Sequence, residues 1–213
     1  GMPLDGYPPE GFIAQGLFTS QDEIDNSPEP LLGTVVRPGD IKYRDINGDG
    51  RIDNDDKAII SPYGNNPRIQ YGIGANLRWK NWDLGVFFNG SAKRTIIAGN
   101  ITAFGTNDYN VMQFVADRAW RLDNPDPNAE YPRLGLTTAD NANNMETSTY
   151  WMRNGNFIRF KTLELGYSFK YGRVYLNGDN LAVWGPFKDW DPELEWHKYP
   201  LSRTFTLGVQ LKF

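Results

Sequence analysis

Runs in which every second residue is apolar are the clearest pattern along the chain. Side chains of a strand point alternately to opposite faces, so each run predicts a strand with one apolar and one polar face. The runs cover residues 69–80, 82–89, 162–169 with an earlier start near Phe157, 173–180 and 203–213. The pattern therefore predicts an all-β chain, an antiparallel meander of about five strands.

The connections between these runs are alternately short and long. Residues 80–81 and 170–172 are tight corners, whereas residues 91–156 and 181–200 are long excursions rich in Gly, Asn, Asp and Pro. Short turns at one end and long loops at the other are typical of bacterial outer-membrane barrels. A half-buried strand of a soluble sandwich alternates in the same way, but has no reason for this rhythm. The sequence favours the C-terminal end of an outer-membrane β-barrel.

In a barrel wall, the apolar face of these strands contacts lipid. The residues expected to face lipid are Tyr71, Ile73, Leu77, Leu84, Val86, Leu163, Leu165, Leu207, Val209, Leu211 and Phe213. Trp79, Trp82 and Tyr171 flank the two short turns, where an aromatic girdle would lie at the membrane surface. Aromatic packing across the hairpins is the alternative for these three residues.

One helix is expected in the long excursion. Asp108 can cap it, and Asn124 with Pro125 would end it. The residues expected on its apolar face are Val111, Met112, Val115, Ala116, Ala119 and Trp120. The expected division of the chain is residues 1–68 as an extracellular-type loop region and residues 69–213 as C-terminal barrel strands with two long extracellular loops.

Composition excludes several kinds of function. The 213 residues contain no cysteine, a single histidine and a net charge of −4, with 22 basic against 26 acidic side chains. Thiolate chemistry, a histidine triad and a multi-histidine zinc site are therefore excluded, and no basic field is available for nucleic acid. The carboxylates near His197 lie in a Pro-containing loop and are expected to be solvated, so no enzyme is predicted.

An acidic segment has the spacing of an EF-hand calcium loop. Its oxygen-bearing positions are Asp45, Asn47, Asp49, Arg51 through its carbonyl, Asp53 and Asp56. Gly50 stands at the place of the sharp turn, and Asp56 replaces the usual longer glutamate. The pattern predicts a weak structural calcium site, and the alternative is an Asx-rich turn that needs no metal.

Three tryptophans in the last long loop are candidate contacts for a ligand or a partner. Trp184, Trp190 and Trp196 could stack against sugar rings or pack against another protein. Packing within the loop itself is an equally good account of them.

Several segments, in order along the chain, resemble the C-terminal end of SusC/RagA-type TonB-dependent transporters. The resembling segments are residues 38–53 (PGDIKYRDINGDGRID), 82–91 (WDLGVFFNGS), 150–169 (YWMRNGNFIRFKTLELGYSF), 173–181 (RVYLNGDNL) and 199–213 (YPLSRTFTLGVQLKF). An aromatic last residue, Phe213, also resembles the sorting signature of outer-membrane proteins.

The resemblance implies part of the wall and outer loops of a nutrient importer in the bacterial outer membrane. The family imports oligosaccharides or peptides and works with TonB and a SusD-like surface lipoprotein. About five strands are far fewer than the roughly 22 of a plugged transporter, so a fragment that cannot transport alone is expected. The alternative is a soluble extracellular module that binds carbohydrate and is stabilised by calcium, in which the apolar set must be buried.

Alone, such a fragment would expose an apolar face and two open strand edges to water. We expect it to cover that face by folding its loops or the Asp108 helix across it, by closing a smaller barrel, or by self-association.

Overall fold

A computed structural model describes residues 8–98, 110–194 and 198–212 of the chain. The chain divides into two compact units. One contains Tyr63–Thr95 and Arg153–Phe213 and is called the sheet unit here. The other contains Tyr7–Pro62 and Ile96–Met152 and is called the loop unit. Helix α3 (Gln113–Arg118), where the sequence placed a helix, is one of several short helices. No helix in the described ranges is long and apolar enough to cross a membrane.

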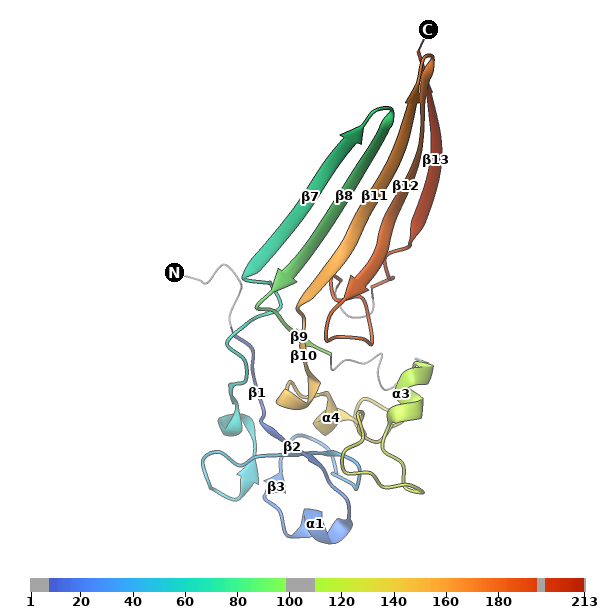
Figure 1. Ribbon diagram of the computed structural model, residues 1–213. Helices are drawn as coiled ribbons and strands as arrows, with labels where there is room; N and C mark the ends of the chain where they lie inside the picture. Colours follow the sequence, from blue (N-terminus) through green and yellow to red (C-terminus); the bar gives the residue numbers. More distant parts are fainter. Residues whose placement is uncertain (1–7, 99–109, 195–197, 213) are drawn as a thin grey trace. The chain divides into compact units, whose positions relative to one another are not determined.

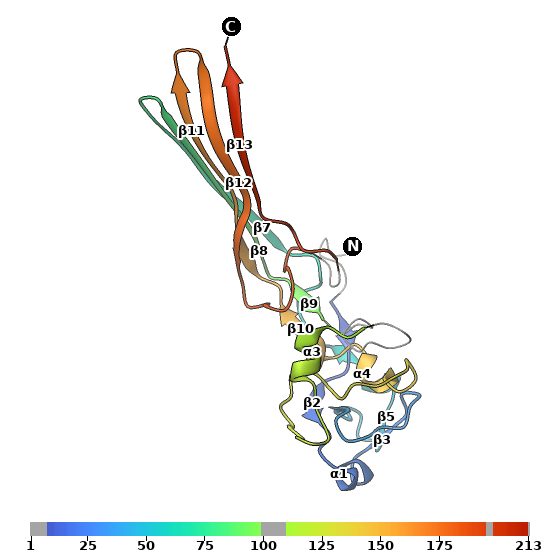
Figure 2. The same cartoon turned by 90° about the vertical axis from the view of Figure 1, so that its right-hand side faces the viewer.

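The sheet unit is built on one antiparallel sheet of five strands (Figure 1). Its strands are β7 (Ile69–Trp79), β8 (Trp82–Ala92), β11 (Phe157–Phe169), β12 (Gly172–Trp184) and β13 (Thr204–Leu211). Their order across the sheet is β13-β12-β11-β8-β7. The strands lie side by side in both views (Figures 1 and 2), and the predicted five-stranded antiparallel sheet is confirmed.

Two strands are longer than the alternation predicted. β8 continues to Ala92, paired with Ile69, and β12 continues to Trp184, paired with Ile158. The last long connection therefore begins at Gly185 and not at residue 181. The alternation is weak at these ends because Gly90, Ala92 and Ala182 stand where larger apolar side chains would mark the apolar face.

A β-bulge at Lys161 changes the phase of β11. Phe160 pairs with Phe88, and Thr162 pairs with the adjacent Phe87, so Lys161 is the extra residue. A bulge adds one residue to one strand and moves the following side chains to the other face of the alternation. Arg159 and Thr162 consequently lie on the same face of the sheet although they are three positions apart.

The sheet is open among the described strands. β7 and β13 each have one neighbour, so the five strands do not close into a smaller barrel. Tight turns join β7 to β8 at residues 80–81 and β11 to β12 at residues 170–171. Lys80 adopts a positive φ of 54°, which lets the chain reverse within two residues.

The loop unit contains short strand pairs and short helices. The pairs are β1 (Glu10–Gly11) with β6 (Ala58–Ile59), β2 (Ala14–Leu17) with β4 (Ile41–Tyr43), and β3 (Glu29–Pro30) in parallel with β5 (Arg51–Ile52). Its helices are α1 (Gln21–Asp25), α3 (Gln113–Arg118) and α4 (Ala142–Met145), with 3₁₀ turns at η1 (Asn54–Asp56) and η2 (Thr149–Trp151). β9 (Thr95–Ile97) and β10 (Met152–Asn154) pair at points where the chain passes between units.

A separate hydrophobic core holds the loop unit together. The core residues are Phe12, Leu17, Ile41, Tyr43, Ile52, Val115, Ala119, Trp120, Tyr131 and Trp151. They come from both segments of the unit, so residues 96–152, expected as a loop of the strand region, share a core with residues 7–62.

The structure corrects the expectation of one short helix. Of the predicted helix, α3 covers residues 113–118, and its capping residue Asp108 lies outside the described residues. The helix ends at Arg118, before Asn124, because Ala119 is already extended. α1 was not foreseen; the Ser20 hydroxyl caps it by accepting a hydrogen bond from the Glu23 N–H at 3.2 Å.

Candidate functional site

The five-stranded sheet has two chemically distinct faces. Strand register places apolar residues or glycine at each paired position on one of them, here called the apolar face. Its large side chains are Ile69, Tyr71, Ile73, Leu77, Trp79, Trp82, Leu84, Val86, Phe88, Ile158, Phe160, Leu163, Leu165, Tyr167, Phe169, Val174, Leu176, Trp184, Phe205, Leu207, Val209 and Leu211. Ten of the eleven residues expected to face lipid are in this set, and Phe213 lies outside the described residues.

Much of the apolar face is exposed. Ile73 is 67% exposed, Leu77 63% and Leu207 73%. Neither folded loops nor a helix buries these side chains among the described residues. So large a contiguous apolar surface is unusual for a soluble monomer and marks a contact with lipid or protein.

Aromatic side chains gather where the two short turns lie. Trp79 pairs with Trp82 across the first turn, and the Trp82 and Tyr167 rings are 4.9 Å apart. Phe169 and Tyr171 extend this group at the second turn, and Tyr171 is mostly exposed. Trp82 packs across strands, as the alternative of aromatic packing expects. Trp79 and Tyr171 are mostly exposed, as a girdle at a membrane surface would require.

The opposite, polar face carries an ion cluster near the same turns. Arg173 on β12 binds Asp83 on β8 through two nitrogens and also Glu164 on β11, at 2.6 Å. Arg78 is the register partner of Asp83. Charged groups that link three neighbouring strands fix the polar face and keep it hydrated, which suits the wall of an aqueous space.

A second ion cluster ties the last long connection to the polar face. We call residues 185–194 the strap. The Arg159 side chain is 3% exposed and binds Asp191 at 2.5 Å and Glu193 at 2.9 Å. Arg94 donates to the Pro192 carbonyl, and Asn89 donates to Glu193 at 3.3 Å. The strap therefore packs on the polar face of β8 and β11.

The sequence did not reveal the role of Arg159. It lies in the part of β11 before the bulge, where the alternation read from residue 162 has the wrong phase. An arginine surrounded by Phe157, Ile158 and Phe160 was the available signal, because a charged side chain among apolar ones needs a partner.

The acidic loop is folded by its own side chains. Asp45 accepts hydrogen bonds from the N–H groups of Gly48 and Gly50, at 2.6 and 2.9 Å. Asn47 accepts from the N–H of Asp49, and Asp49 from that of Arg51. Gly50 has a φ of 81°, the left-handed turn expected at this place.

Asp56 and Asp53 close the acidic loop. Asp56 is fully buried and accepts from the N–H groups of Ile46 at 2.7 Å and Asp53 at 3.0 Å. Burial raises the pKa of Asp56, but these hydrogen bonds outweigh it, and the pKa lies below its ordinary value. Within the described ranges no three acidic or histidine side chains gather as a metal cluster, and calcium binding stays a prediction.

The two candidate tryptophans that the structure describes lie in different settings. Trp184 lies on the apolar face at the end of β12 and is half exposed. Trp190, in the strap, donates its indole N–H to the Lys198 carbonyl at 2.8 Å. Trp196 lies outside the described residues.

The sequence comparisons find receptors of one kind. TonB-dependent receptor P26 of Formosa agariphila is 30% identical over 226 residues, which cover 93% of this chain and 22% of that receptor. TonB-dependent receptor SusC of Bacteroides thetaiotaomicron is 27% identical over 221 residues, covering 95% of this chain and 20% of SusC. No protein-family model matches the chain.

Solved structures show the same fold. The RagAB peptide importer in its open-open state superposes with a TM-score of 0.63 and 21% identity, over 96% of this chain and 22% of that one. Another structure of the RagAB peptide transporter gives 0.63 and 22% identity, over 98% and 23%. The chain spans about a fifth of the length of the relatives it matches. TonB-dependent transporters are not enzymes, and this chain is homologous to TonB-dependent receptors of the SusC/RagA type.

Proposed function

We propose that this chain forms part of the barrel wall and outer loops of a TonB-dependent nutrient importer in the bacterial outer membrane. The two-faced sheet carries the proposal. Its apolar face contacts the hydrocarbon of the bilayer, and its polar face lines the interior of the barrel. The remaining wall belongs to other parts of a longer receptor, so the chain alone does not transport.

Strand geometry supports a membrane wall. β7 and β8 have 11 residues each and β11 has 13. A tilted strand needs about 9–11 residues to cross the hydrocarbon layer. The open edges of β7 and β13 would pair with neighbouring strands of the full barrel, which removes the hazard of exposed edges.

The alternative of a soluble carbohydrate-binding module has less support. Such a module must bury its apolar residues, yet Ile73, Leu77 and Leu207 are mostly exposed. Trp184 also lies on the apolar face of the sheet.

The related proteins indicate which partners and which transported substrates the intact receptor would have. RagAB is described as a peptide importer, and SusC as a TonB-dependent receptor. By this analogy the intact receptor works with TonB and a SusD-like surface lipoprotein and imports oligosaccharides or peptides.

An antibody raised against this chain tests the proposal in cells. We expect it to detect a protein several times longer than 213 residues in the outer-membrane fraction. A native protein no longer than this chain, or one that stays in the soluble fraction, would overturn the proposal.

Spin labels on neighbouring positions test the orientation of the sheet in that receptor. Leu77→Cys and Leu207→Cys place a label on the apolar face, and Asn76→Cys and Thr206→Cys are matched controls on the polar face. In bilayers we expect the first pair to collide with oxygen dissolved in lipid, and the second with a water-soluble nickel chelate. Equal exposure of all four labels to the nickel chelate would contradict a membrane wall.

A further inference from the structure

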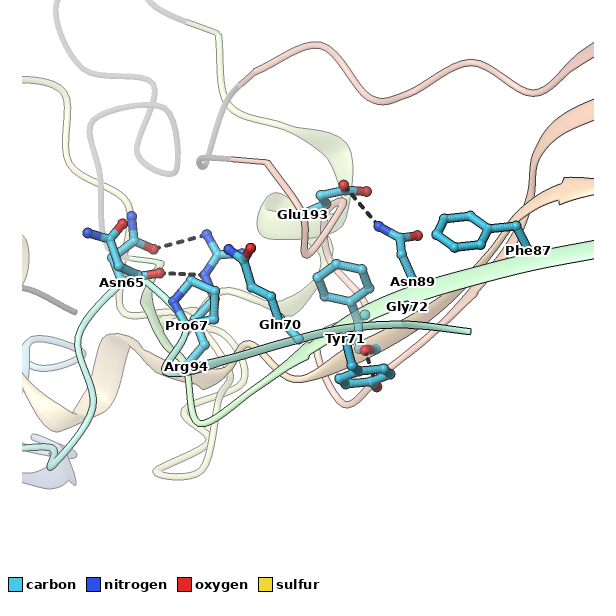
Figure 3. Close-up of a pocket in the computed structure, with 13 residues that line it drawn as sticks. Asn65, Pro67, Gln70, Tyr71, Gly72, Phe87, Asn89, Arg94 and Glu193 are labelled. Atoms are coloured by element: carbon cyan, nitrogen blue, oxygen red, sulfur yellow. Dashed lines mark hydrogen bonds between the residues drawn. The ribbon is translucent and has the colours of Figure 1, made fainter. Parts of the chain in front are cut away.

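A pocket of about 570 Å³ lies in the sheet unit, where β7 and β8 meet the strap (Figure 3). Its polar lining comes from Asn65, Asn66, Gln70, Asn89 and Ser91. The volume is within the range of roughly 300–1,000 Å³ found for small-ligand sites. Figure 3 shows Gln70, Phe87 and Asn89 on one side of the two strands and Tyr71 turned to the other.

The ring of Phe87 forms one flat wall of this pocket. Phe87 is the large apolar residue of β8 that the register places on the polar face. Its ring covers Gly72 and Gly74, since a Cβ on Gly72 would lie 2.9 Å from the ring. Phe87 is 42% exposed, so one surface of its ring rests on glycine backbone and the other is open. An open aromatic face among polar groups can stack on the apolar side of a ligand ring.

Two buried polar atoms of the pocket lack a hydrogen-bond partner among the described residues. They are the Asn89 Oδ1 and the Ser91 Oγ, and Ser91 is only 4% exposed. A buried polar atom without a partner costs about 1–3 kcal/mol, so it is retained where something else satisfies it. Both atoms are covered in this structure, so a ligand with hydroxyl groups would supply the missing donors and acceptors once these two side chains rotate toward the pocket.

The charged groups of the pocket are already engaged. Arg94 donates to the Asn65 carbonyl at 2.6 Å, to the Asn65 side chain at 3.1 Å and to the Pro192 carbonyl. Glu193 binds Arg159 and Asn89. A free peptide brings charged termini that this lining does not match, whereas amide and hydroxyl side chains suit a neutral, hydroxyl-rich molecule.

We infer that this pocket binds a neutral saccharide unit, with its ring stacked on Phe87 and its hydroxyl groups bonded to Asn89 and Ser91. The inference rests on the proposed function only in placing the pocket on the channel side of the wall. There it acts as a subsite along the path of an imported oligosaccharide.

Ligand-observed NMR on the whole chain, in a detergent without a sugar head group, tests this inference. The probes are maltotetraose, cellotetraose and xylotetraose, with zwitterionic tetra-alanine as the peptide comparison. We expect at least one saccharide to bind. Phe87→Leu removes the flat ring, and Ser91→Ala removes one hydrogen bond to the saccharide. Each variant weakens saccharide binding about fivefold.

Phe88→Leu is the matched control, because Phe88 lies next to Phe87 but on the apolar face, stacked on Phe160. It leaves saccharide binding unchanged. Ser91→Ala does not lower the melting temperature, since its hydroxyl has no partner to lose. Three results would each overturn the inference: no binding of any saccharide, equal weakening by Phe87→Leu and Phe88→Leu, or tetra-alanine binding that displaces the saccharide. None of them bears on the spin-label result, which tests the membrane wall by itself.

Discussion

Two asparagine side chains complete the backbone hydrogen bonding of Ile41 in the loop unit. The Asn144 Oδ1 accepts from the Ile41 N–H at 2.9 Å, and the Asn143 amide donates to the Ile41 carbonyl at 2.9 Å. Asn144 also donates to the buried Asp40 at 2.6 Å. These side chains take the place of a neighbouring strand beside β4.

We expect Asn144→Ala to destabilise the loop unit by about 1–3 kcal/mol, because it leaves the buried Ile41 N–H and Asp40 carboxylate without this partner. The indole N–H of Trp151, which donates to the Asn144 carbonyl, reports the transition by NMR during thermal unfolding. Asn128→Ala, at an exposed position of the same unit, serves as the control. Equal melting of both variants would show that the asparagine bonds contribute little.

The buried Asp56 predicts how the stability of the loop unit depends on pH. Its folded-state pKa is lowered, with burial opposing and hydrogen bonds from Ile46 and Asp53 favouring the charged form. Its contribution is complete above the unfolded pKa of about 3.9 and is lost as the pH falls through the lower folded value.

Asp56→Asn should therefore flatten the fall in melting temperature as the pH drops below the unfolded pKa of about 3.9. Asp55→Asn, next to it but exposed, should keep the wild-type slope. The same slope in all three proteins would mean that Asp56 does not govern acid unfolding.

Calcium binding by the acidic loop is a further prediction at this scale. Asp45, Asn47 and Asp49 use some oxygen lone pairs on backbone N–H groups, and a carboxylate can accept several bonds at once. We expect heat on calorimetric titration at about millimolar calcium, as for weak extracellular sites, and its loss in Asp45→Ala. Asp126→Ala, an exposed acid elsewhere in the unit, should retain it. An absence of heat in the unmodified chain would count against a calcium site.

At the scale of elements, the alternation of apolar residues predicted the five strands of the sheet and the face of most of their residues, but not the C-terminal ends of β8 and β12. It failed at the bulge beside Lys161, where one extra residue reverses the phase. It also gave no sign of the loop unit, whose core joins Phe12 and Ile41 to Val115 and Trp151. Contacts between segments so far apart leave no periodic signal in the sequence.

Arg159 holds the strap to the sheet, and its removal should release the strap. The side chain is buried with Asp191, so Arg159→Leu leaves an unpaired buried carboxylate at a cost of about 3–5 kcal/mol. We expect faster hydrogen exchange and proteolysis across residues 185–194. Arg203→Leu, which removes an exposed arginine before β13, should change neither.

A compensating variant distinguishes the effect of an unpaired buried charge from the effect of lost packing between the strap and the sheet. Replacing Arg159, Asp191 and Glu193 together with leucine removes the whole buried ion group, so most of the lost stability should return. A triple variant as unstable as Arg159→Leu would mean that packing of the strap, and not its charge balance, sets the stability.

For the whole molecule, the exposed apolar face predicts how the isolated chain behaves in water. Five strands with two open edges and an uncovered apolar face should associate in the absence of detergent, since both apolar area and unpaired backbone groups become buried. Sedimentation velocity should give a monomer in detergent micelles and larger species without them.

Ile73→Glu combined with Leu207→Glu puts charges on the apolar face and should shift the distribution towards monomer. Asn76→Glu with Thr206→Glu adds the same charge to the polar face and should leave association unchanged. If both pairs dissolve the larger species equally, net charge and not the apolar face controls association, and a monomer without detergent would contradict the prediction outright.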